Sequence, residues 1–279
     1  MNNDDQQLER DEPEEDRRPR RRRRDEDEDL RAAPKRSSTG MIIGIVLGVG
    51  FAMQLVIGGL IALLLPAVKK LQETAARSKN MNNMKTIGLA QHSVHDTVNG
   101  MMGPNAVDGR TGEVYTNHSW RTGMLPYMEQ DSLYRGIDMK QPWDAARNAQ
   151  FTSVVVPQFR DISDANQATT ATPYRVFVGG GAVFNPDGKP VSLKSISDGT
   201  SNTILVVQAF DTVPWAKPQE LNYSPTAPLP KLGSPGNSSG FMVLVADGSV
   251  RFVGNKVSDA TLRKLIEKAD GQTIGVEEW

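Results

Sequence analysis

Residues 41–65 form a run of 25 residues without a single ionisable side chain. Fifteen of them are Leu, Ile, Val or Phe, five are Gly, and Gln54 is the one polar member. As an α-helix the run would be about 37 Å long, against a bilayer hydrocarbon core of roughly 30 Å. A buried core helix would need protein on all its faces, and a cleaved secretory signal would need a shorter run and a small-x-small cleavage site. The run therefore predicts a transmembrane helix.

Charged residues are concentrated directly before this run. The chain has 32 Lys and Arg against 33 Asp and Glu, and residues 1–40 hold 11 of the basic and 13 of the acidic residues. Because this segment has few large apolar side chains, burial cannot offset the entropy of ordering it, and we expect a disordered tail. The arginine-rich block at residues 17–24 could bind anionic lipid or nucleic-acid phosphates. Because acidic residues follow directly and neutralise part of its charge, we favour a block that stays in solvent and sets the orientation of the membrane helix. We expect no nucleic-acid partner.

The distribution of Lys and Arg around the apolar run predicts its orientation. Residues 21–40 carry seven of these residues, whereas residues 66–85 carry five. Basic residues are retained on the cytoplasmic side of a membrane helix. We therefore expect a cytoplasmic N-terminus and an extracytoplasmic C-terminal part.

Strong helix formers continue beyond Pro66, and no helix breaker follows until Gly88. Apolar residues then recur at helical spacing, with Gln91 filling one gap in the apolar face, at Met81, Met84, Ile87, Val94 and Val98. The pattern predicts one helix from about residue 41 to about residue 97. Residues 66–98 would form the half of it that packs on a domain.

After residue 100 the sequence changes to short β-rich runs at residues 174–178, 203–210, 241–245 and 250–253. The pair Asp247-Gly248 lies between the last two runs, as a tight hairpin turn requires. Short helices are expected over residues 125–134, 143–150 and 259–269. The sequence thus predicts an α+β fold in which residues 99–279 form one domain and an antiparallel sheet packs on the helix at residues 69–98.

Several sequence blocks in this order are typical of one known family. They are residues 62–68, 73–77 and 82–96 of the long helix, Ser119-Trp120-Arg121 with residues 125–130, and then residues 196–207 and 246–252. Together they resemble a bacterial prepilin-like family of unknown function, domain-of-unknown-function family fifteen fifty-nine, over roughly residues 60–255. The resemblance implies a pilin-like fold at the bacterial cytoplasmic membrane. The positions that carry its motifs are Pro66, Asn82, Asn83, Gly88, Trp120, Arg121, Pro126, Glu129, Gln130, Asp198, Gly199, Thr200, Ser201, Asn202, Thr203, Asp247 and Gly248.

The chain departs from the family's pattern at two positions. Prepilin-like members are cut after a Gly that precedes an aromatic residue and Thr-Leu-Val-Glu. In this chain Gly44 would stand before the cut, but Val49 occupies the position of the Glu. Without cleavage, the tail and the apolar helix would remain as a permanent anchor. The family's C-terminal motif is His, nine residues, Asp-Gly, and Asn237 stands in place of the His. No role that rests on this His transfers to the chain.

The chain has no cysteine, which excludes disulfides and thiolate chemistry. His92 and His95 share a helix face beside Asp96, and His118 could be a third metal ligand. No His-Glu-x-x-His pattern is present, so packing or solvation of these side chains is the favoured interpretation. Residues 198–202 and Asp247 are best explained as turn formers. We expect no enzyme, cofactor or metal.

The resulting hypothesis is a non-catalytic, single-pass envelope protein with a structural or assembly role. Its partners would be the membrane and either other envelope proteins or a second copy, since Gly44 and Gly48 allow close helix packing. The alternative is an extracytoplasmic solute- or glycan-binding module with Trp215, in the proline-rich segment 214–235, as a stacking surface. A metal enzyme built on the three histidines ranks below both.

Overall fold

The computed structural model describes residues 38–279, except 165, 236–238, 273 and 276–278, and gives no side-chain placement for residues 66 and 67. The expected disordered tail therefore lies outside the described residues up to residue 37. The chain divides into two compact units, Met1–Gly59 and Leu60–Trp279.

The predicted long helix is confirmed as α1, Ser38–Val98, which has 61 residues and begins three residues before the expected start. The most apolar stretch of α1 is wholly exposed. Within the described part of the chain, α1 alone is long and apolar enough to cross a membrane. The backbone remains helical through Pro66. A helix satisfies all its backbone hydrogen bonds within one segment, which is what a lipid environment demands of an apolar run.

The second unit contains a four-stranded antiparallel sheet in the order β3-β5-β7-β8. Its strands are β3 (Ala171–Arg175), β5 (Ile204–Pro214), β7 (Gly240–Val245) and β8 (Val250–Gly254). Two further pairs are antiparallel β1 (Asn105–Val107) with β2 (Val114–Ser119), and parallel β4 (Phe177–Val178) with β6 (Leu221–Asn222). The predicted α+β class is thus confirmed. The expected strand at 174–178 is divided at Val176, because its N–H donates to the Glu220 carboxylate at 2.9 Å.

The hairpin predicted at Asp247-Gly248 joins β7 to β8. Gly248 has a φ of +88°, a conformation in which a residue without a Cβ carries no steric penalty. The N–H of Ser249 donates to the Asp247 carboxylate at 2.8 Å, and the N–H of Val245 donates to the carbonyl of Ser249 at 2.9 Å. A side chain and a backbone bond therefore fix the turn together.

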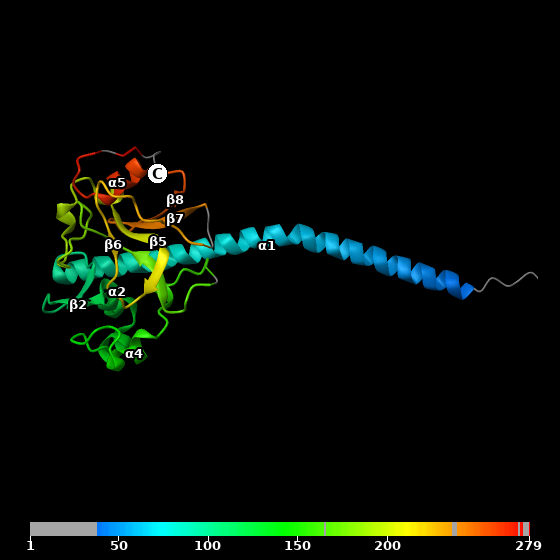
Figure 1. Ribbon diagram of the computed structural model, residues 1–279, viewed down its shortest axis with the longest axis horizontal. Helices are drawn as coiled ribbons and strands as arrows, with labels where there is room; N and C mark the ends of the chain where they lie inside the picture. Colours follow the sequence, from blue (N-terminus) through cyan, green and yellow to red (C-terminus); the bar gives the residue numbers. More distant parts are fainter. Residues whose placement is uncertain (1–37, 165, 236–238, 273, 276–278) are drawn as a thin grey trace, which may run out of the picture. The chain divides into compact units, whose positions relative to one another are not determined.

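The central strand β7 is buried on both faces. Met242 and Leu244 pack in one core with the C-terminal half of α1, whereas Val243 and Val245 pack in a second core with α5 (Asp259–Ile266). Successive strand residues point to opposite faces, so this alternation places the sheet between two helices. Figure 1 shows α5 and the C-terminal half of α1 on opposite sides of β7 and β8. The predicted packing of the sheet on residues 69–98 is confirmed.

Short helical segments complete the second unit. The expected helix 125–134 is divided into η1 (Leu125–Met128) and α3 (Asp131–Gly136), because Glu129 adopts a left-handed φ of 60° that ends the first segment. Ser258 caps the N-terminus of α5, since its hydroxyl accepts from the N–H of Thr261 at 3.0 Å. The others are α2 (Trp120–Met124), α4 (Ala146–Thr152), η2 (Pro157–Phe159), η3 (Leu193–Ser195) and η4 (Thr200–Asn202).

Candidate functional site

The Ser-Trp-Arg motif marks the junction between β2 and α2. Ser119 is the N-cap of α2, and its hydroxyl accepts from the backbone N–H of Arg121 at 3.3 Å. Trp120 and Arg121 follow in the first turn, and both side chains are completely buried. A buried arginine is costly unless its charge and its N–H groups find partners.

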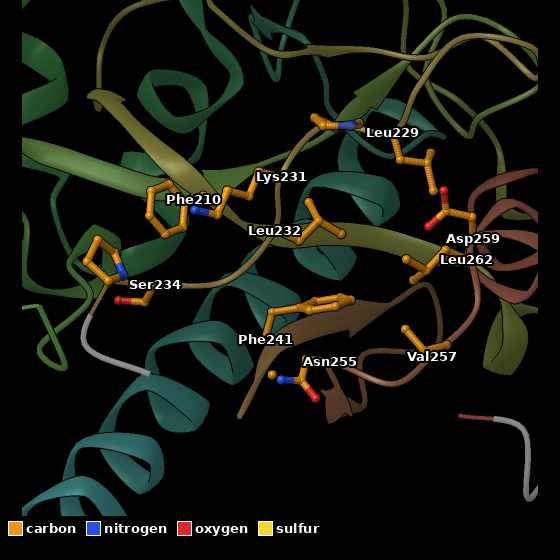
Figure 2. A pocket seen from close by; sticks show the side chains of 13 residues that line it. Phe210, Leu229, Lys231, Leu232, Ser234, Phe241, Asn255, Val257, Asp259 and Leu262 are labelled. Atoms are coloured by element: carbon orange, nitrogen blue, oxygen red, sulfur yellow. The ribbon is translucent and has the colours of Figure 1, made fainter. Parts of the chain in front are cut away.

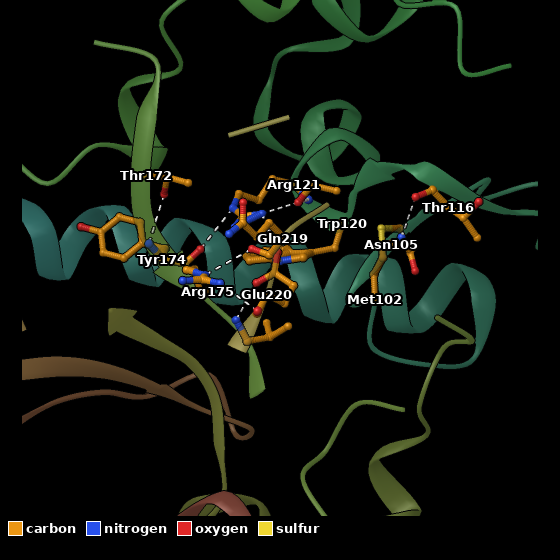
Figure 3. Close-up of polar contacts among 12 residues, drawn as sticks. Met102, Asn105, Thr116, Trp120, Arg121, Thr172, Tyr174, Arg175, Gln219 and Glu220 are labelled. Atoms are coloured by element: carbon orange, nitrogen blue, oxygen red, sulfur yellow. Dashed lines mark hydrogen bonds and ion pairs between the residues drawn. The ribbon is translucent and has the colours of Figure 1, made fainter. Parts of the chain in front are cut away.

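Nη1 and Nε of Arg121 find partners on segments distant in the sequence (Figure 3). Its Nη1 lies 2.8 Å from Oε1 of Glu220, and its Nε donates to the carbonyl of Tyr174 at 3.1 Å. The indole Nε1 of Trp120 donates to the same Glu220 oxygen at 3.1 Å. Two adjacent motif residues on α2 therefore both donate to the carboxylate of Glu220, the residue directly before β6.

Burial governs the ionisation of this pair. Burial lowers the pKa of Arg121 to about 10, although the Glu220 charge opposes that shift. Burial likewise raises the pKa of Glu220, against the opposing charge of Arg121. Arg175 adds a second clamp, since its Nη2 donates to the backbone carbonyl of Glu220 at 2.7 Å. The group joins α2, β3 and the segment before β6 in a site closed to solvent, which indicates a structural role for the motif.

Motif residues of the long helix and of the C-terminal hairpin meet in the same core. Gly88 is so close to the hairpin that a Cβ there would lie 2.8 Å from Cδ1 of Leu244 and 3.4 Å from the carbonyl oxygen of Gly248. The N–H groups of Ala246 and Asp247 donate to the carbonyls of Thr203 and Thr200 at 2.9 and 3.0 Å. Three sequence blocks more than forty residues apart thus converge on one turn.

The Asp-Gly-Thr-Ser-Asn block turns the chain before β5 and anchors a second segment. Gly199 has a φ of +97°, and the N–H of Asn202 donates to its carbonyl at 3.0 Å. The Asp198 carboxylate accepts from the N–H groups of Asp270 and Gly271 at 2.6 and 3.0 Å. Ser201 supplies a side-chain hydrogen bond to Asp247. These contacts fit the turn-forming role that the sequence indicates.

Polar residues of α1 hold loops against the helix. Asn83 donates through Nδ2 to the carbonyls of Pro157 and Arg160, both at 3.1 Å, whereas the Asn82 side chain is exposed. Gln91 is completely buried and makes two bonds to one residue, donating to the carbonyl of Met102 at 2.7 Å and accepting from its N–H at 2.9 Å. Gln91, the polar residue in the apolar face, therefore fixes the segment that follows the helix by two hydrogen bonds.

The motif around Pro126 forms one wall of an open polar cavity of about 490 Å³. Pro126 occupies the first turn of η1, and the N–H of Gln130 donates to the carbonyl of Leu125 at 3.0 Å. Tyr127 and Tyr134 line the cavity, and burial, with the nearby Asp108 charge, raises the pKa of Tyr134 to about 12. Trp120 is fully buried, and the two tyrosines and Trp143 pack on the main core.

The three histidines occupy separate surroundings. His118 is fully buried on β2, where its Nε2 lies 2.7 Å from the carbonyl of Gln141 and burial lowers its pKa. The half-buried His92 lies against Gly248, and Nδ1 of His95 lies 3.7 Å from the Asp96 carboxylate. Across the described ranges, no group of three or more His, Cys, Asp or Glu side chains could hold a metal ion.

The expectation that Trp215 offers a stacking surface to a ligand is wrong. Trp215 is 1% exposed, its ring stacks on Phe159 at 6.1 Å, and its indole N–H donates to the carbonyl of Val154 at 3.0 Å. The proline-rich segment does, however, border a cavity of about 670 Å³ farther along the chain. Figure 2 shows its lining side chains, which come from residues 229–235 of the segment, from β5, β7 and α5, and from the connection between β8 and α5.

Comparison with known families agrees with the sequence motifs. The fold is an α+β domain built on one long helix whose first part is a candidate membrane span. Residues 69–181 match the model of the family SBP_bac_10, described as Protein of unknown function (DUF1559), and this match supports assigning the segment to that family. The match contains the Asn82–Asn83 and Trp120–Arg121 motifs and ends before Asp198. No curated protein and no solved structure matches the chain significantly.

Proposed function

We propose that the protein is a single-pass, membrane-anchored, prepilin-like protein of the bacterial envelope with a non-catalytic structural or assembly role. One observation carries the proposal, namely that the large apolar side chains at residues 41–65 are 47–75% exposed. So long an apolar surface is unfavourable in water and favourable in lipid, where each Leu, Ile, Phe or Val contributes roughly −0.3 to −0.6 kcal/mol.

The same helix supports the assignment to a prepilin-like architecture. Beyond the apolar run, Met84, Ile87 and Val94 of α1 are fully buried in the main core of the second unit. A separate, cleavable anchor would not contribute to that core. The helix therefore serves as both candidate anchor and structural spine.

The excess of Lys and Arg before the apolar run supports a cytoplasmic N-terminus and an extracytoplasmic domain. The membrane is then one partner, and a second copy or another envelope protein is the other. Crosslinking in native membranes tests self-association, and a purely monomeric chain would reject it. We propose no nucleic-acid partner and no cofactor.

The absence of cysteine from the sequence allows a clean test of topology. Single cysteines are introduced by Ser37→Cys and Ser132→Cys, and intact spheroplasts are treated with a membrane-impermeant maleimide. We expect labelling at position 132 in intact cells and at position 37 only after lysis, with the protein resistant to alkaline extraction. The reverse labelling pattern would reject the orientation, and release by alkali would reject the anchor. The intact mass tests processing, because a chain that begins at Ile45 has been cut after Gly44.

A second function, capture of a small solute by the outer domain, is favoured by the cavity beside residues 229–235. Its volume of about 670 Å³ is typical of small-molecule sites. The two functions are compatible, since an anchored domain can also bind a solute. Saturable binding of a small solute to this cavity is the test.

A further inference from the structure

The wall of the larger cavity is fixed to the sheet at one end. The N–H of Phe210 on β5 donates to the carbonyl of Lys231 at 3.0 Å, and the N–H of Gly233 donates to the carbonyl of Gln208 at 2.9 Å. Ala209 and Leu232 form an antiparallel bridge between these two bonds. The segment at residues 231–233 therefore behaves as a short added strand, and its backbone is held in place.

The wall is fixed to α5 at its other end. The guanidinium of Arg263 donates to the carbonyl of Ser224 at 3.0 Å and to that of Ala227 at 2.7 Å. Between the two attachments the segment contains Pro225, Pro228 and Pro230, whose φ angles are restricted by their rings. A cavity with a wall so restrained is preformed, and a ligand that enters it loses little binding free energy to ordering the protein.

The cavity has an apolar interior and charged ends. Phe241 and Leu262 are buried in its floor, and the side walls include the half-buried Leu229. Lys231 is exposed at one end, with its Nζ 3.4 Å from the centre of the Phe210 ring. Asp259, the exposed first residue of α5, stands at the other end, as Figure 2 shows.

We propose that this cavity binds a short apolar peptide with free termini. An apolar side chain would lie on Phe241 and Leu262, the terminal carboxylate would face Lys231, and the terminal ammonium would face Asp259. A fatty acid would match only the cation, and an amine would match only the carboxylate. The inference rests on the solute-binding function proposed above and specifies the class of solute.

The test uses the full-length chain in lipid nanodiscs and isothermal titration with the dipeptide leucyl-phenylalanine. Its N-acetylated and C-amidated forms serve as probes of the two ends. We expect saturable binding that either modification weakens by roughly threefold to fivefold, the value of a partly exposed charge pair. Lys231→Gln should remove the sensitivity to C-amidation only, and Asp259→Asn the sensitivity to N-acetylation only. The exposed Lys140→Gln and Asp144→Asn are matched controls that should change neither.

A cavity-filling variant locates the site independently of charge. Leu229→Trp should weaken binding by more than tenfold, whereas Val155→Trp, at an exposed residue that does not line the cavity, should leave it unchanged. Equal binding of free and blocked peptides that Leu229→Trp abolishes would overturn the peptide assignment and leave solute binding intact. Binding that survives Leu229→Trp would overturn the assignment to this cavity. If none of these peptides binds saturably, the inference is overturned. The solute-binding function is then tested separately, by whether another solute binds in a manner that Leu229→Trp abolishes.

Discussion

Nη1 of Arg121 lies 2.8 Å from Oε1 of Glu220, although the two residues are 99 positions apart in the sequence, and both side chains are at least 97% buried. Trp120 and Val176 donate to the same carboxylate, so its oxygens are satisfied without water. Such a pair adds little net stability compared with an apolar replacement of both partners. Removal of one partner alone is strongly destabilising, because the other charge is left buried without compensation.

Removing the Glu220 charge should therefore destabilise the domain strongly. Glu220→Gln leaves the Arg121 guanidinium buried without its counter-charge, which we expect to cost roughly 3–5 kcal/mol in the free energy of unfolding. Denaturant unfolding of the full chain in detergent, followed by the fluorescence of its four tryptophans, measures the change. The control is Asp131→Asn, which breaks an exposed 2.6 Å pair with Arg135 and should cost less than about 1 kcal/mol. Equal costs for the two variants would contradict the role of the buried pair.

The clamp between Gln91 and Met102 gives a second prediction. Gln91→Met replaces the amide with an apolar side chain of similar length and leaves the backbone N–H and carbonyl of Met102 without their Gln91 partners in a buried place. We expect it to cost about 2 kcal/mol or more, since each unsatisfied group costs roughly 1–3 kcal/mol. The exposed Ser93→Ala, two positions along the helix, should lie within about 0.5 kcal/mol of the parent chain. Parent-like unfolding of Gln91→Met would show that Met102 finds other partners.

The close approach of α1 to the hairpin predicts that Gly88 cannot be enlarged. Alanine is favoured over glycine in a helix by about 1 kcal/mol, but a Cβ at this position would lie 2.8 Å from the completely buried Leu244. We expect Gly88→Ala to bring no stabilisation and Gly88→Val to destabilise by roughly 1–3 kcal/mol through overpacking. Gly254→Ala is the control, because none of the described residues places an atom within 4 Å of its Cβ position. A more stable Gly88→Ala chain, measured by thermal unfolding, would refute the predicted steric limit.

Features encoded by neighbouring residues were predictable from the sequence. The apolar periodicity of α1 and the Asp247-Gly248 turn depend on local composition, and both occur where expected. The partner of Arg121 was not predictable, because no local pattern relates the Ser-Trp-Arg motif to a glutamate in a proline-rich segment. Trp215 was misplaced for a related reason. The proline-rich composition of its segment indicates surface, whereas the indole is drawn into the core by stacking on Phe159.

The hairpin carboxylate provides a prediction about pH. Burial alone would raise the pKa of Asp247, but hydrogen bonds from Ser249 and Ser201 outweigh it and hold the pKa below its ordinary value of 3.8. The ionised form is therefore bound more strongly in the folded state, and its contribution to stability is present above the ordinary pKa and lost as the pH falls through the folded value. Asp247→Asn keeps an acceptor for the Ser249 N–H and removes this titration. We expect its melting temperature to fall less steeply than that of the parent chain from about pH 5 downward, while the exposed Asp144→Asn follows the parent curve. Parallel curves for Asp247→Asn and the parent chain would show that this carboxylate does not stabilise the turn through its charge.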